Sequence, residues 1–395
     1  MYLTSFVHRE TLFEIAGRWF CNLLSPEDGL SLTQILISDG FVLGETLEAV
    51  TSFLLETIYA PPFSMNRIHF KGELREMLCR DECQGNGRVK ELIRRYKDDP
   101  DFFYREVPIN GVVCLDSKGR LLGVYRVKRP RRIAEKANRY VANWIFKMVQ
   151  ESARKMAEQR AQNLGIPLES LLTTETEMVR EFVKAEEAIA GGFQQGRIDF
   201  DKAAMAINDV GGIKIVADED RLAILEEQLS HHPTFKILDR GTYQGNYQAR
   251  SFILEMPWDR ELICQSFIFK GAWERYRHRG IPEEVLRKGL ESFLWDAQPT
   301  LHIELILSTF PAMVESELGI SIHEERIMAQ RRNKAYQGYI PMNVEFLIEY
   351  LLAVALSPEI HIEGLPVKLW GRYLPDTISF HIRQLYRLPT HETLY

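Results

Sequence analysis

Two carboxylates stand where the sequence predicts the start and the interior of β-strands. Asp209 lies in INDVGGIKIVADEDR, residues 207–221, where a polar turn and two glycines precede a short apolar strand. Glu304 lies inside the apolar segment LHIELIL, residues 301–307. Burying a carboxylate costs free energy unless a cation pairs with it, and Mg²⁺ is commonly bound by one or two carboxylates together with substrate phosphates. The two residues could therefore hold a divalent cation. Alternatively, Asp209 could cap a tight turn and Glu304 could face solvent.

A segment between these carboxylates has the composition of a nucleotide-binding site. KILDRGTYQGNYQARS, residues 236–251, is interrupted by glycines and rich in Tyr, Lys and Arg. Aromatic rings stack on bases, and Lys and Arg side chains neutralise phosphates. The same composition also suits an ordinary polar loop. A basic run, RVKRPRR at 126–132, could likewise contact phosphates or form a solvated face.

The elements that must position these residues follow from the spacing of apolar residues. Residues 1 to about 105 repeat apolar side chains at threes and fours and predict mainly helices, whereas the alternation over 111–129, split by DSKG, predicts a β-hairpin. Further strands are expected at 212–217, 249–256 and 301–307, and further helices at about 132–163, 173–190, 219–230, 281–295, 311–330 and 342–356.

This order of elements predicts an α+β protein with a mixed β-sheet flanked by helices. We divide the chain into a mainly helical N-terminal region of unknown function, residues 1–130, which ends in the hairpin. A central domain, residues 131–335, carries the candidate site, and residues 336–395 form a C-terminal helical extension and tail.

Composition points to a cytoplasmic protein without a membrane partner. The chain has 395 residues, 45% of them hydrophobic and 26% charged, and no apolar run reaches the length of a membrane span. The formal net charge of −6 gives no general reason to expect nucleic-acid binding. Five scattered cysteines are most simply reduced thiols, and Cys79 and Cys83 lack the second pair that a zinc site would need. Nothing in the sequence predicts an oligomeric state.

Segments between residues 175 and 335 together resemble the synthetase domain of the RelA/SpoT alarmone-synthetase family. The family's first motif, D-x-x-A/G-x-R, reads DVGGIK here, from Asp209 to Lys214, and the helix that precedes it in the family resembles VKAEEAIAGGF, which contains Lys184. Lys236 and Tyr247 keep the spacing of the second motif. The third motif begins at Glu304 and continues in register at Thr309, Glu317, Gly319 and His323.

The resemblance implies a nucleotidyltransferase-like fold and a Mg²⁺-dependent transfer of pyrophosphate from ATP to a ribose 3′-hydroxyl. The acceptor would be a nucleotide such as GDP or GTP, or an RNA 3′ end as in the toxin branch of the family. Asp209 and Glu304 would hold Mg²⁺, and Glu304 or a water that it orients would accept the hydroxyl proton. The implied substrate contacts are Tyr247 stacked on the acceptor base, Lys184, Lys214, Lys236 and Arg240 on phosphates, and His323 on substrate.

The chain also departs from the family pattern. Ile306 and Ser308 replace a Gln and an Arg of the third motif, and Lys214 replaces an Arg whose planar bidentate contact a Lys cannot copy. The long separation of Tyr247 from Glu304 predicts an insertion at about 255–300, which makes Glu261 a rival metal ligand. Two hypotheses therefore stand: an active pyrophosphokinase, and a catalytically degenerate domain that binds a nucleotide or a protein. Residues 1–200 lack the sequential His-Asp pair of the family's hydrolase domain.

Overall fold

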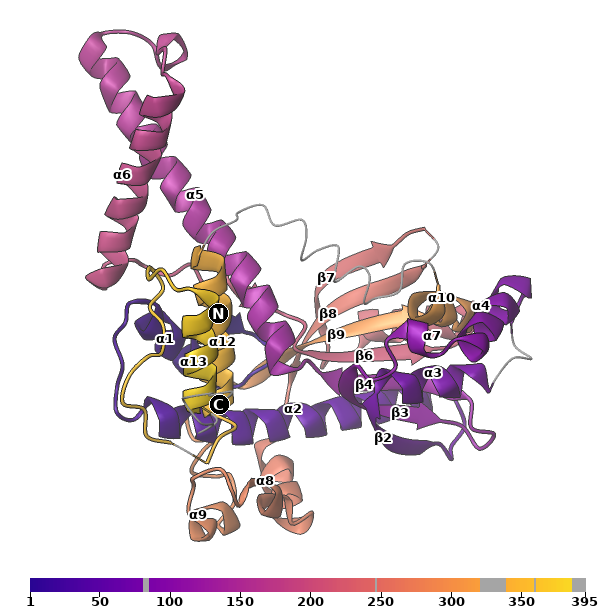
Figure 1. Cartoon of the computed structure of the whole chain (residues 1–395). Coiled ribbons are helices and arrows are strands. Elements are labelled where there is room, and N and C mark those ends of the chain that lie inside the picture. The colour runs from indigo at the N-terminus through magenta and orange to yellow at the C-terminus, as the bar shows by residue number, and fades with distance from the viewer. Residues whose placement is uncertain (81–84, 246, 320–338, 359, 386–395) are drawn as a thin grey trace, which may run out of the picture.

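The main β-sheet of the described chain has seven strands of mixed direction and lies beside a largely helical part (Figure 1). The computed structural model describes residues 1–80, 85–245, 247–319, 339–358 and 360–385. Within this sheet of the described residues only β6 and β9 run parallel, and the other neighbouring strands are antiparallel, which confirms the predicted mixed sheet of an α+β protein. In spatial order the strands are β2 (Ser64–Phe70), β3 (Pro108–Leu115), β4 (Leu121–Val127), β6 (Gly211–Val216), β9 (Thr300–Ser308), β8 (Ala249–Pro257) and β7 (Lys236–Tyr243).

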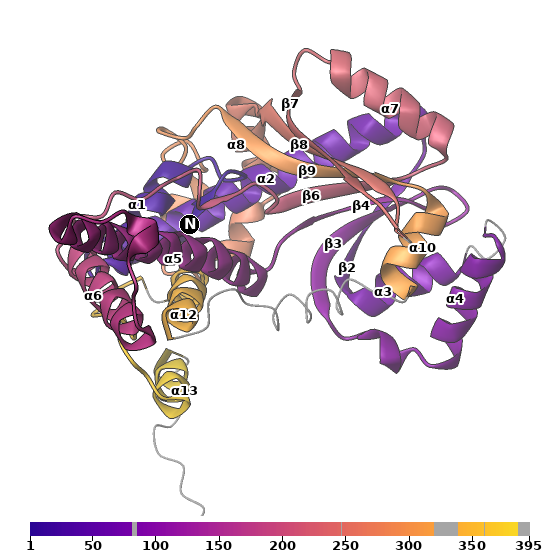
Figure 2. The same ribbon diagram turned by 90° about the horizontal axis from the view of Figure 1, so that it is seen from above.

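One face of this sheet packs against the long helix α2 (Asp28–Ile58). Side chains alternate between the two faces of a strand, so Ile213 and Ile215 of β6 lie on the same face as Leu305 of β9. These residues join the main hydrophobic core with apolar residues of α2. Helix α7 (Glu219–His231) lies on the same side, as Figure 2 shows.

The opposite face is apolar at one end and polar at the other. Helices α3 (Lys71–Cys79), α4 (Gly87–Asp98) and α10 (Phe310–Leu318) cover β2, β3 and β4 there (Figure 2). At the other end of this face, β6, β9 and β8 present partly exposed side chains: Lys214, His302, Glu304, Ser251 and Glu255. We call this second part the polar face.

Two helices form an arm that projects from the body of the protein (Figure 1). They are α5 (Pro130–Leu164) and α6 (Glu175–Gln194), joined by a turn that contains the 3₁₀ helix η3 (Leu168–Ser170). The base of α5 packs against α12 (Tyr339–Val354), and Trp144 of α5 contacts Phe193 of α6 edge to face. A further C-terminal helix, α13, spans Pro375–Leu385.

The segment between β8 and β9 lies on the far side of α2 from the sheet (Figure 1). It contains α8 (Arg260–Phe269), η4 (Ala272–Tyr276) and α9 (Glu283–Arg287). Phe267 of α8 packs edge to face on Phe41 of α2, with ring centroids 5.0 Å apart. The predicted insertion therefore packs against α2, away from the polar face.

The N-terminal residues run between elements that are distant in sequence. Strand β1 (Tyr2–Leu3) pairs in parallel with β5 (Ala206–Ile207), and α1 (Arg9–Phe20) follows. The boundary expected near residue 130 falls between β4 and α5, and strands from both sides of it form one sheet.

The predicted hairpin and the three predicted strands are confirmed, but three other expectations were wrong. Residues 64–70 and 236–243 form the edge strands β2 and β7, where helix and loop had been expected. Most of their side chains are exposed, so they lack the alternation that would have identified them. The helix expected over 281–295 is only α9, and Gly289 has a φ of +98° soon after it ends. Beyond Leu318, the helix expected over 311–330 falls largely outside the described residues.

Candidate functional site

Asp209 lies in the turn between β5 and β6 and is held by two lysines. The Lys128 ammonium lies 2.8 Å from Asp209 Oδ2 and also donates to the backbone carbonyl of Asp209. Lys136, in the second turn of α5, donates to the same Oδ2. Asp209 Oδ1 is buried and has no hydrogen-bond partner in the described chain. One carboxylate oxygen is thus paired twice, and the other is left without a donor.

The charges around Asp209 keep its carboxylate ionised. Burial alone would raise the pKa of Asp209, but the ammonium groups of Lys128 and Lys136 outweigh it and lower the pKa to about 2. Burial also lowers the pKa of Lys128, an effect that Asp209 and Glu304 oppose. Glu304 therefore lies close enough to Lys128 to act on its charge.

Glu304 points onto the polar face beside a residue without a side chain. It is opposite Gly212 of β6 and Ile253 of β8. A Cβ atom at Gly212 would lie 3.7 Å from Glu304 Oε2, so the glycine leaves space next to the carboxylate. Within the described residues Glu304 makes no hydrogen bond or ion pair, although the charges of Lys128 and Lys214 act on it.

Lys214 of β6 lies next to Tyr247, which precedes β8. The Lys214 ammonium is 5.2 Å from the centroid of the Tyr247 ring, a cation–π contact. Burial lowers the pKa of Lys214 to about 8, with Glu317 and Glu304 opposing the effect and Lys71 and Arg126 adding to it. The Tyr247 side chain is buried, and the Lys214 ammonium occupies one side of its ring.

Two residues of the third motif have structural partners. Thr309 caps the N-terminus of α10 by accepting from the Ala312 amide. Glu317 is buried and accepts from the Lys71 ammonium at 2.6 Å, with Arg75 at 3.6 Å. Burial alone would raise the pKa of Glu317, but Lys71, Lys214 and Arg75 outweigh it and lower the pKa to about 2. These contacts attach α10 to α3.

Arg240 lies on the opposite side of the sheet from Glu304. It is paired with Phe252, whose ring it covers at 5.5 Å and which belongs to the core under α2. Its guanidinium binds Glu226 and Ser230 of α7. A register shift between Ile237 and Asp239 turns Arg240 to this face. The structure therefore does not bring Arg240 to the other candidate residues.

The remaining candidates are distributed over the molecule. Lys236 is on the polar face but at its far end, where it binds Glu255 at 2.9 Å. Lys184 is on α6, which packs against α5 in the arm (Figure 1), so it is not part of the group around Asp209. Glu261 is exposed on α8, and its carboxylate accepts from Gln265. His323 lies outside the described residues.

Neither of the two lysines that contact Asp209 was predicted from the sequence as a site residue. Lys128 follows β4 directly and lies in the basic run at 126–132, which was the one available signal. Lys136 lies in the second turn of α5, 73 residues before Asp209. Arg126 is opposite Gly212, on the same face as Glu304, and completes a group of four cations near two carboxylates.

Comparisons with known proteins do not assign the chain to a family. No helix within the described ranges is long and apolar enough to cross a membrane. Among the same residues, no group of three or more His, Cys, Asp and Glu side chains is arranged to hold a metal ion. Comparison of the chain with protein-family models, curated proteins and solved structures found no match.

Proposed function

We propose that the polar face binds ATP with Mg²⁺ and that the protein transfers pyrophosphate to the hydroxyl of a nucleotide resembling GDP or GTP, or of an RNA 3′ end. The observation that carries this proposal is a pair of carboxylates surrounded by lysines, with Asp209 in the turn that leads into β6 and Glu304 on the neighbouring strand β9. Asp209 precedes Gly211 and Gly212, and Glu304 is opposite Gly212.

The cations support binding of a polyphosphate. Lys128, Lys136, Lys214 and Arg126 gather around the two carboxylates and leave an excess of positive charge. Lys and Arg are the side chains that neutralise phosphate oxygens. Gly212 has no side chain to hinder a ligand that approaches β6 from the polar face.

The carboxylates fit a divalent cation. Asp209 Oδ1 has no hydrogen donor, and Glu304 has no ion pair with the described residues. Buried carboxylate oxygens without partners are costly, and Mg²⁺ takes such oxygens together with those of a phosphate. Bound there by Asp209 and Glu304, Mg²⁺ would supply charge neutralisation for the phosphate oxygens.

The residues of this chain would position the reactants of a balanced transfer. The acceptor hydroxyl oxygen forms a bond with the β-phosphorus of ATP, the bond from that phosphorus to the α,β-bridging oxygen breaks, and AMP leaves. Glu304, or a water bonded to it, accepts the hydroxyl proton. Lys128 and Lys136 would exchange part of their contact with Asp209 for phosphate oxygens, since positioning and charge compensation dominate this chemistry.

A second function, binding of a nucleotide without catalysis, is favoured by one observation. Lys128 and Lys136 already neutralise Asp209. If these ion pairs persist when ATP is bound, Asp209 would not reach a metal ion, and the polar face would hold the nucleotide only.

A transfer assay separates the two functions. The protein is incubated with γ-labelled ATP, Mg²⁺ and, in turn, GDP, GTP, ADP and tRNA, and the products are resolved by chromatography. We expect label on one acceptor together with an equal amount of AMP, and loss of both by at least about 100-fold in Asp209→Ala and Glu304→Gln, the size typical for removal of electrostatic stabilisation. Glu261→Gln, on the other side of α2, should keep full activity.

Binding is measured separately by thermal shift with ATP and Mg²⁺, because a ligand that binds only the folded state raises its melting temperature. Lys214→Ala should reduce the shift, and Arg240→Ala, on the other face, should leave it unchanged. A shift without transfer would favour the binding function. No shift for the wild type, or equal shifts for the two variants, would contradict a nucleotide site on the polar face.

A further inference from the structure

The N-terminal segment, residues 2–9, touches the turn that carries Asp209. Beyond the pairing of β1 with β5, the Thr4 amide donates to the Ile207 carbonyl at 3.2 Å, and the Thr4 hydroxyl donates to Asn208 Oδ1 at 2.8 Å. The Gly211 amide donates to Ser5 Oγ at 3.4 Å. These bonds lie on both sides of Asp209 in the sequence, so the segment fixes the backbone that presents the carboxylate.

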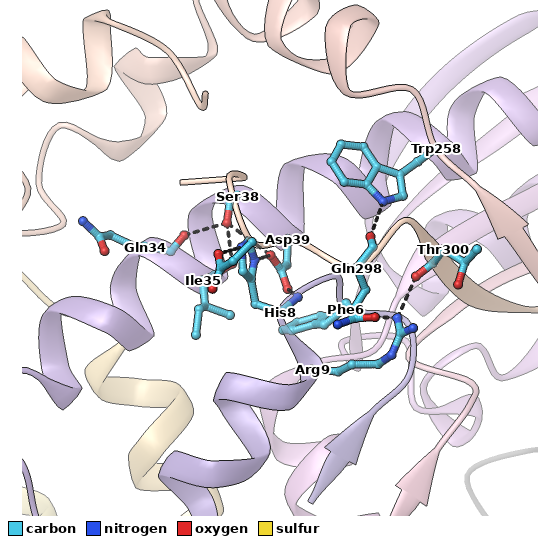
Figure 3. Close-up of polar contacts among 11 residues, drawn as sticks. Phe6, His8, Arg9, Gln34, Ile35, Ser38, Asp39, Trp258, Gln298 and Thr300 are labelled. Carbon is cyan, nitrogen blue, oxygen red and sulfur yellow. Dashed lines mark hydrogen bonds and ion pairs between the residues drawn. The ribbon is translucent and has the colours of Figure 1, made fainter. Parts of the chain in front are cut away.

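The same segment touches the start of β9, the strand that carries Glu304. The His302 amide donates to the Thr4 carbonyl at 3.1 Å, and the Gln298 amide donates to the Val7 carbonyl at 2.8 Å. Arg9 donates to the Thr300 carbonyl at 2.6 Å (Figure 3). Thr4 therefore bonds to both elements, and this short piece of chain adds a second link to the direct pairing of β6 with β9.

His8 anchors this segment between two carboxylates. Its amide donates to Asp39 Oδ2 of α2 at 2.8 Å, and its ring Nδ1 lies 2.5 Å from Asp39 Oδ1 (Figure 3). Ring Nε2 lies 3.3 Å from Oδ1 of Asp296, in the segment that leads to β9. His8 and Asp39 are buried, whereas the Asp296 side chain is 39% exposed.

The protonated ring is the state that is attracted to both carboxylates. A neutral imidazole has a single N–H, so it can donate to one carboxylate while its other nitrogen presents a lone pair to the second. An imidazolium instead presents positive charge to both carboxylates, although its Nε2 makes no hydrogen bond to Asp296 within the described chain. The other groups facing the ring are the Phe293 carbonyl and, through Asp39, the Ser38 hydroxyl, which donates to Asp39 Oδ1. Arg9 directs its guanidinium to the Phe6 and Thr300 carbonyls instead.

We propose that His8 is a proton-dependent positioning residue, whose imidazolium form holds the N-terminal segment and thereby sets Asp209 relative to Glu304. Burial alone would lower the pKa of His8, but Asp39 and Asp296 outweigh it and raise the pKa. A raised pKa in the folded state means that this stabilisation is complete below the unfolded value and is lost as the pH rises through the folded value. The consequence for transfer activity rests on the proposed function, whereas the effect on the backbone does not.

Hydrogen–deuterium exchange without nucleotide tests the proposal. Protection of peptides covering 206–212 and 298–306 is measured from pH 6 to pH 9 and corrected for intrinsic exchange. In the wild type we expect protection to fall over this range, because the stabilisation by the imidazolium is lost as the pH rises. In His8→Gln, protection should already be low at pH 6 and should not change with pH.

Asp296→Asn is the more discriminating variant. It keeps the bond from Nδ1 to Asp39 and removes the negative charge opposite Nε2, so the pH dependence of protection should become smaller. His69→Gln and Glu291→Gln, at exposed positions, should behave as the wild type. A flat profile in the wild type, or an unchanged pH dependence in Asp296→Asn, would overturn the proposal. If His8→Gln does not fold, Asp296→Asn decides alone. Because no ATP is present, failure of the transfer assay would leave this result intact.

Discussion

At Asp209, burial and ion pairing act in opposite directions on one carboxylate. Burial disfavours the charged form, and two ammonium groups favour it more strongly. The lysines in turn lie in a site where their own charges are partly desolvated: Lys128 and Lys136 expose less than a fifth of their side chains. Each charge in the group therefore depends on the others, and removal of one partner leaves the rest uncompensated.

Asp209→Asn should consequently destabilise the protein at neutral pH. In phosphate-free buffer at pH 7 we expect the free energy of unfolding to fall by about 1–3 kcal/mol, because two lysines lose their carboxylate. The folded pKa of about 2 lies below the ordinary value of 3.8. The stabilisation is therefore fully present above pH 3.8 and is lost as the pH falls through about 2. Urea denaturation followed by circular dichroism at pH 7, 4 and 3 measures whether the stabilities of the wild type and Asp209→Asn approach each other as the pH falls.

The control for this prediction is an aspartate of ordinary environment. Asp101 is 91% exposed, with Arg105 at 3.7 Å, so Asp101→Asn should change stability by less than about 0.5 kcal/mol at every pH. Equal stability of the wild type and Asp209→Asn at pH 7, or a difference that stays constant down to pH 3, would show that the lysines do not stabilise the folded state through Asp209.

Among the elements, α3 and α10 are joined by ionic contacts within an apolar interface. Lys71, Arg75 and Glu317 are buried beside the second hydrophobic core, which includes Phe310 and Val314. A buried charge without a partner is costly, so the two helices must keep the orientation that pairs Lys71 with Glu317. Since α10 follows β9 directly, this contact also sets the helix at the end of the strand that carries Glu304.

A double-mutant cycle measures that contact. Lys71→Met leaves Glu317 buried with Arg75 at 3.6 Å, and we expect it to lower the free energy of unfolding by about 3 kcal/mol. Glu317→Gln should also destabilise, and the double variant should lose less than the sum, with a coupling energy of at least about 1 kcal/mol. The exposed pair Arg154–Glu158 on α5 should give a coupling below about 0.5 kcal/mol. Additive effects at Lys71 and Glu317 would contradict the assignment.

At the scale of the whole molecule, the arm formed by α5 and α6 differs from the body in how far its side chains are buried. Its base contributes to the main core through Val149 and Phe193, whereas most side chains toward its turn are exposed. Leu172, in that turn, is 96% exposed. Local stability follows the density of buried apolar contacts, so the outer arm should open more readily than the sheet.

Limited proteolysis tests this difference. Thermolysin, which cleaves before large apolar residues, should cut between residues 168 and 174, where Leu171 and Leu172 lie. The two fragments should elute together from a size-exclusion column, because α5 and α6 are each attached to the body at their inner ends. Leu171→Ser with Leu172→Ser should slow this cut by about tenfold without changing the melting temperature. A turn that resists cleavage while loops of the sheet are cut would contradict the prediction.

The sequence by itself determined the elements whose pattern is local. The hairpin over β3 and β4 and the strands β6, β8 and β9 are readable because apolar side chains alternate or run continuously. The same reading placed Asp209 in the turn before one strand and Glu304 inside another, and the structure pairs these two strands, β6 and β9.

Only the tertiary structure decided which side chains surround those carboxylates. Lys128 and Lys136 reach Asp209 because β4 pairs with β6 and α5 starts beside them, a contact across more than 70 residues that no local pattern encodes. Lys236 and Arg240 are four residues apart and would share a face of a regular strand, but one extra residue between Ile237 and Asp239 reverses the alternation. Spacing along the chain therefore identified the carboxylates, whereas strand pairing and register selected their partners.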